Sequence, residues 1–218
     1  MNIALVEYGA GNLPSVERAL ARLGVQSRRA STPEELAGCD ALILPGVGHF
    51  GALMRSLGER SLVEPLRNAV AQGTPLLGIC LGLQAMFATS DEAPGDAGLA
   101  LFPQKVSALP AVDRLPHMGW NQLRRAQPSK LLERVPEDAY FYFAHSYAAL
   151  DAGDAGVAYC DHCGSFVAVV EQKNVFATQF HPEKSGPVGA QILTNFLRQA
   201  DTQARQAGLP DRQAGGRA

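Results

Sequence analysis

Residues 75–84, Pro-Leu-Leu-Gly-Ile-Cys-Leu-Gly-Leu-Gln, run from a short apolar stretch directly into a cysteine flanked by two glycines. The apolar stretch predicts a buried strand over 75–79, and the following residues predict a helix over 82–88. Cys80 therefore falls on a tight turn between a strand and a helix, the setting of a nucleophile elbow. Glycines around a buried structural cysteine would give a similar pattern, so further residues must decide.

The first half of the chain alternates between strand and helix signals. An apolar run at residues 3–6 precedes a segment, 16–23, whose apolar residues recur at helical spacing. Thr-Pro-Glu-Glu at 32–35 resembles a capped helix start, and a second apolar run occupies 41–44. This alternation predicts an α/β fold with a mostly parallel central sheet covered by helices.

The second half has shorter strand signals separated by Gly, Pro and Asp. The aromatic run at 140–143 and the stretch 157–180 predict antiparallel strands that extend the sheet and cover its edge. A helix is expected from about 187 to 200. We predict one domain over 1–200 and a frayed or disordered tail over 201–218, where sustained periodicity is lacking.

Composition excludes several classes of partner. The chain has 218 residues, 46% of them hydrophobic, which is enough for a sizeable core. Its 19 basic and 21 acidic residues leave a net charge of −2, so no general attraction to nucleic acid or to an anionic membrane is expected. The start of the chain lacks a basic leader, and no apolar run is long enough to span a bilayer. We expect a soluble cytoplasmic protein.

Four cysteines, Cys39, Cys80, Cys160 and Cys163, are too few and too scattered for a disulfide framework. At least one is therefore free to act as a nucleophile. Cys-Asp-His-Cys at 160–163 resembles half of a zinc site, but no second Cys/His pair completes four ligands. A hairpin turn with two incidental thiols is the expected structure, and no metal or cofactor is predicted.

Two further segments point to acyl transfer at Cys80. His181 precedes a proline that restrains its backbone, and Glu183 lies two residues later, where its carboxylate could orient the imidazole. The loop Pro-Gly-Val-Gly at 45–48 follows an apolar strand, so its backbone amides could approach a ligand and form an oxyanion hole. An ordinary tight turn is the alternative for that loop.

At these residues the chain resembles the class I, triad-type glutamine amidotransferases, which have a flavodoxin-like fold, and within them the glutaminase subunits of imidazole glycerol phosphate synthases. The resemblance runs from residue 3 to about 200. The matching segments are Tyr-Gly-Ala-Gly-Asn-Leu at 8–13, Pro-Gly-Val-Gly-His-Phe at 45–50, Leu-Gly-Ile-Cys-Leu-Gly-Leu-Gln at 77–84, Pro-His-Met-Gly-Trp-Asn at 116–121, His-Ser-Tyr at 145–147 and Gln-Phe-His-Pro-Glu-Lys-Ser at 179–185.

The resemblance implies a hydrolytic mechanism on glutamine. Cys80 would attack the side-chain amide, His181 would shuttle protons, and Glu183 would hold the imidazole. Ammonia would leave first, and water would then release glutamate from a thioester. The amides of Val47 and Leu81 would form the oxyanion hole.

The resemblance also implies which residues hold glutamine and where the family pattern is broken. The amino-acid end of glutamine would contact Gln84 and residues His145, Ser146 and Tyr147, with Gly48 lining the pocket. The chain departs from the usual family residues at Glu7 (aspartate), Leu83 (methionine) and Ala100 (glycine). The alanine at the last position tests whether the local backbone needs a positive φ, which glycine adopts readily.

A partner protein is expected on two grounds. The resemblance implies a heterodimer with a cyclase subunit, a (βα)8 barrel, which uses the ammonia to make imidazole glycerol phosphate and aminoimidazole carboxamide ribotide in histidine biosynthesis. Independently, 218 residues leave no room for a second catalytic domain, so the ammonia must be used elsewhere. Met118, Trp120, Tyr142 and Lys184 are the predicted interface residues. Core packing is an equal alternative for the tryptophan.

Three other functions remain open from the residues. A glutaminase for another synthase, such as the anthranilate or aminodeoxychorismate type, would share the elbow but less of segments 45–48 and 116–121. A cysteine peptidase of the elbow-bearing α/β type would not require the separate His-x-Glu pair. A non-catalytic regulatory subunit would be expected to have lost at least one member of the triad.

Overall fold

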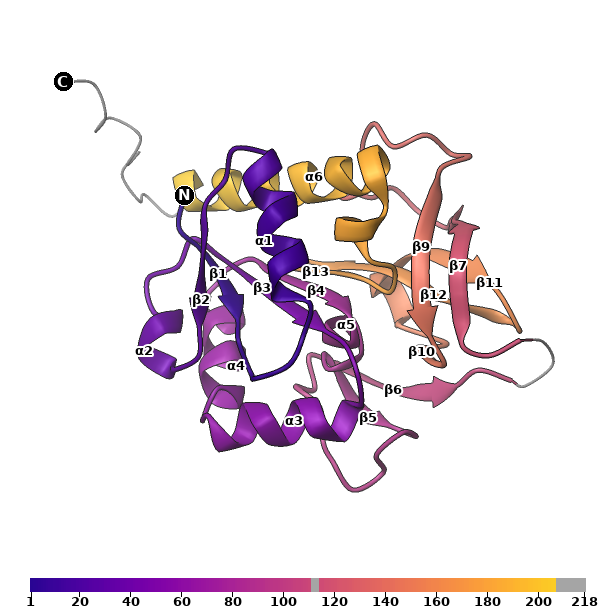
Figure 1. Cartoon of the computed structure of the whole chain (residues 1–218), viewed down its shortest axis with the longest axis horizontal. Helices are drawn as coiled ribbons and strands as arrows, with labels where there is room; N and C mark the ends of the chain where they lie inside the picture. Colours follow the sequence, from indigo (N-terminus) through magenta and orange to yellow (C-terminus); the bar gives the residue numbers. More distant parts are fainter. Residues whose placement is uncertain (111–113, 207–218) are drawn as a thin grey trace.

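The structure, a computed structural model, describes residues 1–110 and 114–206. Its centre is an eight-stranded sheet with the order β2-β1-β3-β4-β13-β12-β11-β8. The strands in that order are Ser27–Ala30, Ile3–Val6, Ala41–Gly46, Leu76–Cys80, Val175–Thr178, Ser165–Gln172, Gly156–Asp161 and Arg124–Arg125. The strands from β2 to β13 run parallel, and β12, β11 and β8 continue antiparallel. The predicted α/β class is confirmed, with its antiparallel extension (Figure 1).

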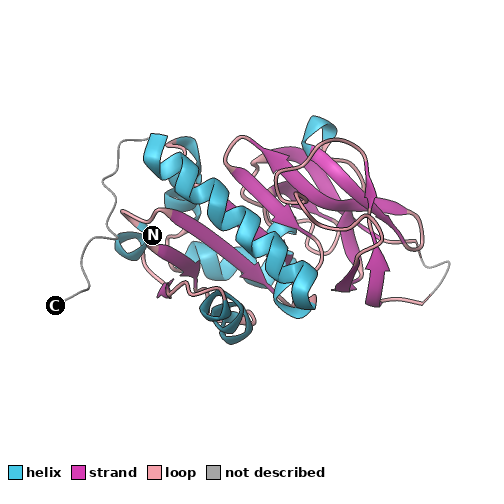
Figure 2. Cartoon of the chain, turned by 90° about the horizontal axis from the view of Figure 1, so that it is seen from above, coloured by secondary structure: helices cyan, strands magenta, loops and turns pink. Residues whose placement is uncertain are grey.

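Helices cover both faces of this sheet because successive residues of each parallel strand point to opposite sides. Ile3 and Leu5 of β1 pack into one core together with α1 and α6, whereas Ala4 and Val6 pack into a second core with α2, α3 and α4. These helices span Leu13–Arg22 (α1), Pro33–Leu36 (α2), Phe50–Glu59 (α3), Val63–Ala71 (α4) and Gly186–Gln206 (α6). Figure 2 shows α6 lying along one face of the sheet. Across the described residues, no helix combines the length and apolar character needed to cross a bilayer.

Two smaller sheets lie beside the central one. Three strands, β5 (Phe87–Ser90), β6 (Phe102–Ala108) and β10 (Tyr147–Ala149), form the first. The second is an antiparallel ribbon of β7 (His117–Gln122) and β9 (Tyr140–His145). We call this pair the β7–β9 ribbon; its inner face packs on the protein body, and its outer face is exposed.

Two helix ends differ from the sequence-based expectation. The helix after Cys80, α5 (Leu81–Gln84), stops well before residue 88 because Phe87 begins strand β5 and pairs with Phe102 of β6. Strand pairing of an aromatic residue prevails there over helical periodicity.

Helix α6 continues to Gln206, whereas its end was expected near residue 200. Asp201 and Arg205 form an ion pair of 3.0 Å one turn apart, and the Thr202 hydroxyl donates to the Arg198 carbonyl. The ion pair supports the additional helical turn. The remainder of the predicted tail, 207–218, lies outside the described residues.

Ala100 has a backbone conformation that glycine adopts more readily than alanine. Its φ is +50°, and its side chain is exposed. Ala100→Gly should therefore raise the free energy of unfolding by about 0.5–1 kcal/mol, because the left-handed conformation costs an L-residue more than it costs glycine. Urea denaturation measures the change. Ala21→Gly, on the exposed side of α1, should lower stability instead, and a loss of stability at both positions would contradict the predicted strain.

Candidate active site

Cys80 ends strand β4 and directly precedes helix α5, so the strand–turn–helix expected from the sequence is present. Its backbone has φ of 55° and ψ of −108°, a strained combination for a residue other than glycine. The neighbouring glycines make this turn possible. A Cβ atom on Gly82 would collide with the carbonyl oxygen of Leu44, and one on Gly78 would lie 2.7 Å from Met86 Cε.

His181 and Glu183 form a buried pair beside this elbow. Glu183 Oε1 lies 2.9 Å from His181 Nδ1, and the two side chains are only 1% and 3% exposed. Strand β9 supports the histidine, because the His181 amide donates to the Tyr142 carbonyl at 2.9 Å. The carboxylate therefore occupies Nδ1 and leaves Nε2 as the ring nitrogen that can face Cys80.

The electrostatics of the site favour a protonated imidazole next to the sulfur. Burial opposes a charge on His181, but the charge and hydrogen bond of Cys80, followed by those of Glu183, raise the pKa of His181 to about 10. A ring that holds its proton beside a sulfur nucleophile can donate that proton to a leaving group. The arrangement is suited to acyl transfer by a cysteine.

A cavity of about 340 Å³ opens at the cysteine. All the residues predicted for the oxyanion hole and for substrate binding line it together with Cys80 and His181. They are Val47, Leu81, Gly48, Gln84, His145, Ser146 and Tyr147. Pro116, Ala144 and Glu92 also line the cavity and were missed from the sequence.

Two of the predicted substrate ligands are already hydrogen-bonded within the protein. Gln84 Nε2 donates to the Tyr147 carbonyl at 2.7 Å and to Gln179 Oε1 at 3.1 Å. His145 Nδ1 lies 3.0 Å from the same carbonyl. Gln84 can therefore offer a ligand only its carbonyl oxygen. Gln179, in turn, places Nε2 3.5 Å from Cys80 Sγ, a contact that the sequence analysis did not predict although this residue stands two positions before His181.

Glu92 is a second residue with no signal in the sequence, since it lies in a loop after β5 without a recognisable motif. Its Oε2 accepts from the Phe50 amide at 2.7 Å, where α3 begins, and the residue lines the cavity. A carboxylate at this point can bind a cationic group of a ligand.

The predicted interface residues form one exposed surface at the cavity mouth. Met118 and Trp120 are 66% and 56% exposed, so core packing of the tryptophan is wrong. The Trp120 and Tyr142 rings lie 6.0 Å apart, and Lys184 Nζ lies 5.5 Å from the centre of the Tyr142 ring. Tyr140 is 53% exposed on the same side of β9. We call these five residues the docking face; Met118 and Lys184 also line the cavity.

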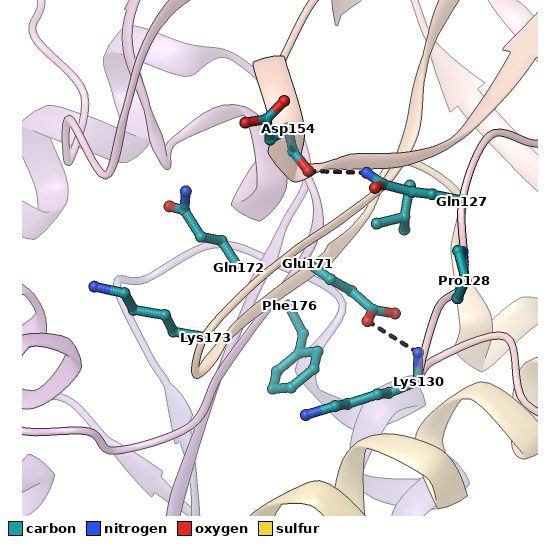
Figure 3. A pocket seen from close by; sticks show the side chains of 9 residues that line it. Gln127, Pro128, Lys130, Asp154, Glu171, Gln172, Lys173 and Phe176 are labelled. Carbon is teal, nitrogen blue, oxygen red and sulfur yellow. Dashed lines mark hydrogen bonds between the residues drawn. The ribbon is translucent and has the colours of Figure 1, made fainter.

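A second hollow, of about 240 Å³, does not form a comparable site (Figure 3). Its carboxylate, Glu171, accepts from the amides of Lys130 and Leu131 and from the Ser129 hydroxyl. Gln127 Nε2 donates to the Asp154 carbonyl at 2.8 Å. These polar groups stabilise the local loops.

The Cys-Asp-His-Cys segment spans the last two residues of β11 and the start of the turn into β12, so it belongs to a hairpin as expected. Cys160 is buried, which raises the pKa of its thiol to about 12 and makes it a poor nucleophile. Within the described part of the chain, no three metal-ligating side chains come together. His162 instead stacks on His117, with ring centres 4.1 Å apart.

A cysteine on an elbow, a histidine–glutamate pair and a parallel sheet define a cysteine hydrolase of the α/β class. The chain belongs to the glutamine amidotransferase class-I family, which matches residues 4–200. Among curated proteins, it is 47% identical over 195 residues to the imidazole glycerol phosphate synthase subunit HisH of Methanothermobacter thermautotrophicus, covering 89% of this chain and 97% of that protein. The protein of the same name from Thermococcus kodakarensis is 44% identical over 205 residues, covering 90% and 99%.

Solved structures agree on the fold. A glutamine amidotransferase crystal structure superposes with a TM-score of 0.74 at 22% identity, covering 91% of this chain and 98% of that one. The structure of PurLQS from Thermotoga maritima gives a TM-score of 0.72 at 18% identity, with the same coverage.

Proposed function

We propose that the chain is the glutaminase subunit of an imidazole glycerol phosphate synthase and acts in histidine biosynthesis. The observation that carries this proposal is the convergence of Cys80, His181 and Glu183 at one cavity, in a chain whose relatives carry that subunit name along nearly their whole length. A non-catalytic subunit would be expected to have lost at least one member of the triad, and this chain has all three. We place the reaction in the cytoplasm, where small biosynthetic substrates are handled.

In the proposed mechanism the Cys80 sulfur attacks the side-chain carbonyl carbon of glutamine. His181 donates its proton to the departing nitrogen, and ammonia leaves a thioester on the cysteine. His181 then takes a proton from water, which attacks the thioester and releases glutamate. Glu183 keeps the imidazole oriented through its bond to Nδ1. The amides of Val47 and Leu81, both at the cavity, would stabilise the oxyanion.

The remaining lining residues suit the amino-acid end of glutamine. We assign the Glu92 carboxylate to the α-ammonium group because it is the lining residue with a negative charge. Gly48, Gln84, His145, Ser146 and Tyr147 complete this part of the pocket. The volume of about 340 Å³ is in the range of small-molecule sites.

The ammonia is proposed to pass to a cyclase subunit, a (βα)8 barrel that forms a heterodimer with this chain. In bulk water ammonia would be mostly protonated and no longer nucleophilic, so a shielded path is needed. The docking face supports this assignment because two of its residues, Met118 and Lys184, line the cavity and its Trp120 is exposed beside them.

The test is to measure glutamate release by the purified chain, alone and with the cyclase and its nucleotide ligand. We expect slow hydrolysis alone and faster hydrolysis in the complex, because docking changes the loop at 45–48 and hence the oxyanion hole. Equal rates of hydrolysis with and without the cyclase would refute the proposal that docking activates the site. Stimulation by an anthranilate or aminodeoxychorismate synthase component, and not by the cyclase, would instead assign the chain to that synthase.

Trp120→Ala should weaken the complex with the cyclase by about 2 kcal/mol, the size expected for an exposed aromatic anchor. Calorimetric titration of the cyclase measures the dissociation constant. Arg205→Ala provides the control and should bind normally, because Arg205 lies at the end of α6 that is far from Lys184 of the docking face. Equal affinity of the Trp120 variant and the unaltered chain would place the interface elsewhere.

A further inference from the structure

The inner face of the β7–β9 ribbon carries two buried histidines in direct contact. His117 Nδ1 lies 3.1 Å from His145 Nε2, and His145 Nδ1 lies 3.0 Å from the Tyr147 carbonyl oxygen. Burial lowers the pKa of His117 to about 4 and that of His145 to about 3, so both rings are neutral at neutral pH. Each neutral ring has one nitrogen that donates and one that accepts.

These contacts determine both tautomers. A carbonyl oxygen only accepts, so His145 carries its proton on Nδ1 and accepts from His117 at Nε2. His117 must then donate from Nδ1 and accept at Nε2, where Asn121 Nδ2 lies at 3.4 Å. The second hydrogen on that amide nitrogen bonds the Asp161 carbonyl at 3.2 Å. The N–H groups of His145, His117 and Asn121 named above thus all have acceptors.

The same hydrogen bonds continue to the nucleophile. The Tyr147 carbonyl also accepts from Gln84 Nε2, which donates in addition to Gln179 Oε1. Gln179 Nε2 in turn contacts Cys80 Sγ at 3.5 Å. We call Asn121, His117, His145, Gln84 and Gln179, with the Tyr147 carbonyl between them, the relay. It connects strand β7 with the sulfur atom through side chains from four separate segments.

The His117 ring is tightly packed within the ribbon. The His117 ring is stacked between Phe143, at 4.7 Å and 24°, and His162, at 4.1 Å and 14°. The next residue of β7, Met118, points to the outer face of the ribbon, as does Trp120 on the same strand. Because side chains alternate along a strand, a shift of β7 caused by contact with the docking face must also move His117.

We propose that His117 and Gln179 are positioning residues that couple the docking face to Cys80 through the relay. Contact of the cyclase with the outer face of the ribbon would change the hydrogen bonds on its inner face. This change would shift the position of Cys80 Sγ and of Ser146 and Tyr147, which line the cavity. This inference rests on the proposed function and names the residues through which the partner acts on the thiol.

The test is a double-mutant cycle with the cyclase and its nucleotide ligand. His117→Phe keeps an aromatic ring between its stacking partners but breaks the relay near the ribbon, and Gln179→Met breaks it next to the sulfur. The readout is the ratio of stimulated to unstimulated glutamate release. Each variant should lower this ratio about tenfold, as expected when a buried polar partner is lost, and the double variant should be no lower than the worse single one.

A second readout separates positioning from general destabilisation. The rate of Cys80 alkylation by iodoacetamide, followed by mass spectrometry of its peptide, should change in both variants, while that of Cys39 stays constant. Asn195→Leu is the control: Asn195 is buried and donates to the Leu131 and Glu133 carbonyls, away from the relay. It should lower the unfolding temperature without changing the stimulation ratio.

The outcomes that overturn the inference differ from those that overturn the proposed function. An unaltered chain that never responds to the cyclase refutes the function. The relay alone is refuted if the unaltered chain responds normally to the cyclase but the losses of the stimulation ratio in the two single variants add up, to about a hundredfold in the double variant. Unchanged alkylation of Cys80 in the variants refutes it as well.

Discussion

Cys80→Ala should reduce glutamate release by at least about 10⁴-fold, because removal of the attacking atom abolishes the thioester pathway and leaves only the binding and oxyanion contributions. The side chain is small and the site lies at a turn, so the fold should persist. Glutamate formation in the presence of the cyclase measures the loss, and binding of the cyclase should be retained.

Cys160→Ala is the matched control for this substitution. Cys160 is also a buried thiol, but it lies in β11 and does not line the cavity, and burial raises its pKa to about 12. This variant should keep its activity. Full activity of the Cys80 variant, or equal loss in both variants, would rule out the proposed nucleophile.

Glu183→Gln should lower kcat/KM by about 10²–10⁴-fold and shift the alkaline limb of the pH profile to lower pH. Glu183 is one of the groups that raise the pKa of His181 to about 10. Without its charge the pKa of His181 falls, so the imidazole loses its proton at a lower pH and the donor to the leaving nitrogen disappears earlier. A neutral amide can also donate to Nδ1 and hold the wrong tautomer.

The pH dependence distinguishes this orienting role from simple loss of structure. Glutamate release is measured from pH 6 to 10, with unfolding followed over the same range. A uniform loss of activity with an unchanged alkaline limb would contradict the assigned role of the carboxylate. Glu171→Gln is a suitable control, because that carboxylate caps the loop at 129–131 and should leave the shape of the profile unaltered.

The parts of the site that could be predicted from the sequence are those encoded by neighbouring residues. The elbow at Cys80 follows from an apolar run and two glycines, and the His181–Glu183 pair lies within three positions. The central parallel sheet could likewise be predicted, because strand and helix periodicities alternate along the first half of the chain. The glycine that the family usually has at position 100 raised the question of a positive φ there, and Ala100 has one.

The parts that could not be predicted depend on contacts between distant segments. Glu92 reaches the cavity only because its loop returns to the start of α3, and Gln179 meets Cys80 across two adjacent strands. Helix α5 ends early because β5 pairs with β6, which no local periodicity reveals. Of the departures from the family pattern, Glu7 forms an ion pair of 3.3 Å with Arg29 of β2, whereas nothing in the structure explains Leu83.

Strand β13 has a consequence for when the protein can work during its synthesis. It lies between β4, which ends at Cys80, and β12, and it leads directly to His181. A nascent chain that has not yet emerged beyond residue 175 has the thiol but no base, and its β4 edge is unpaired. Glutamine can therefore be hydrolysed only after the chain has been translated through Glu183 and β13 has been inserted between β4 and β12.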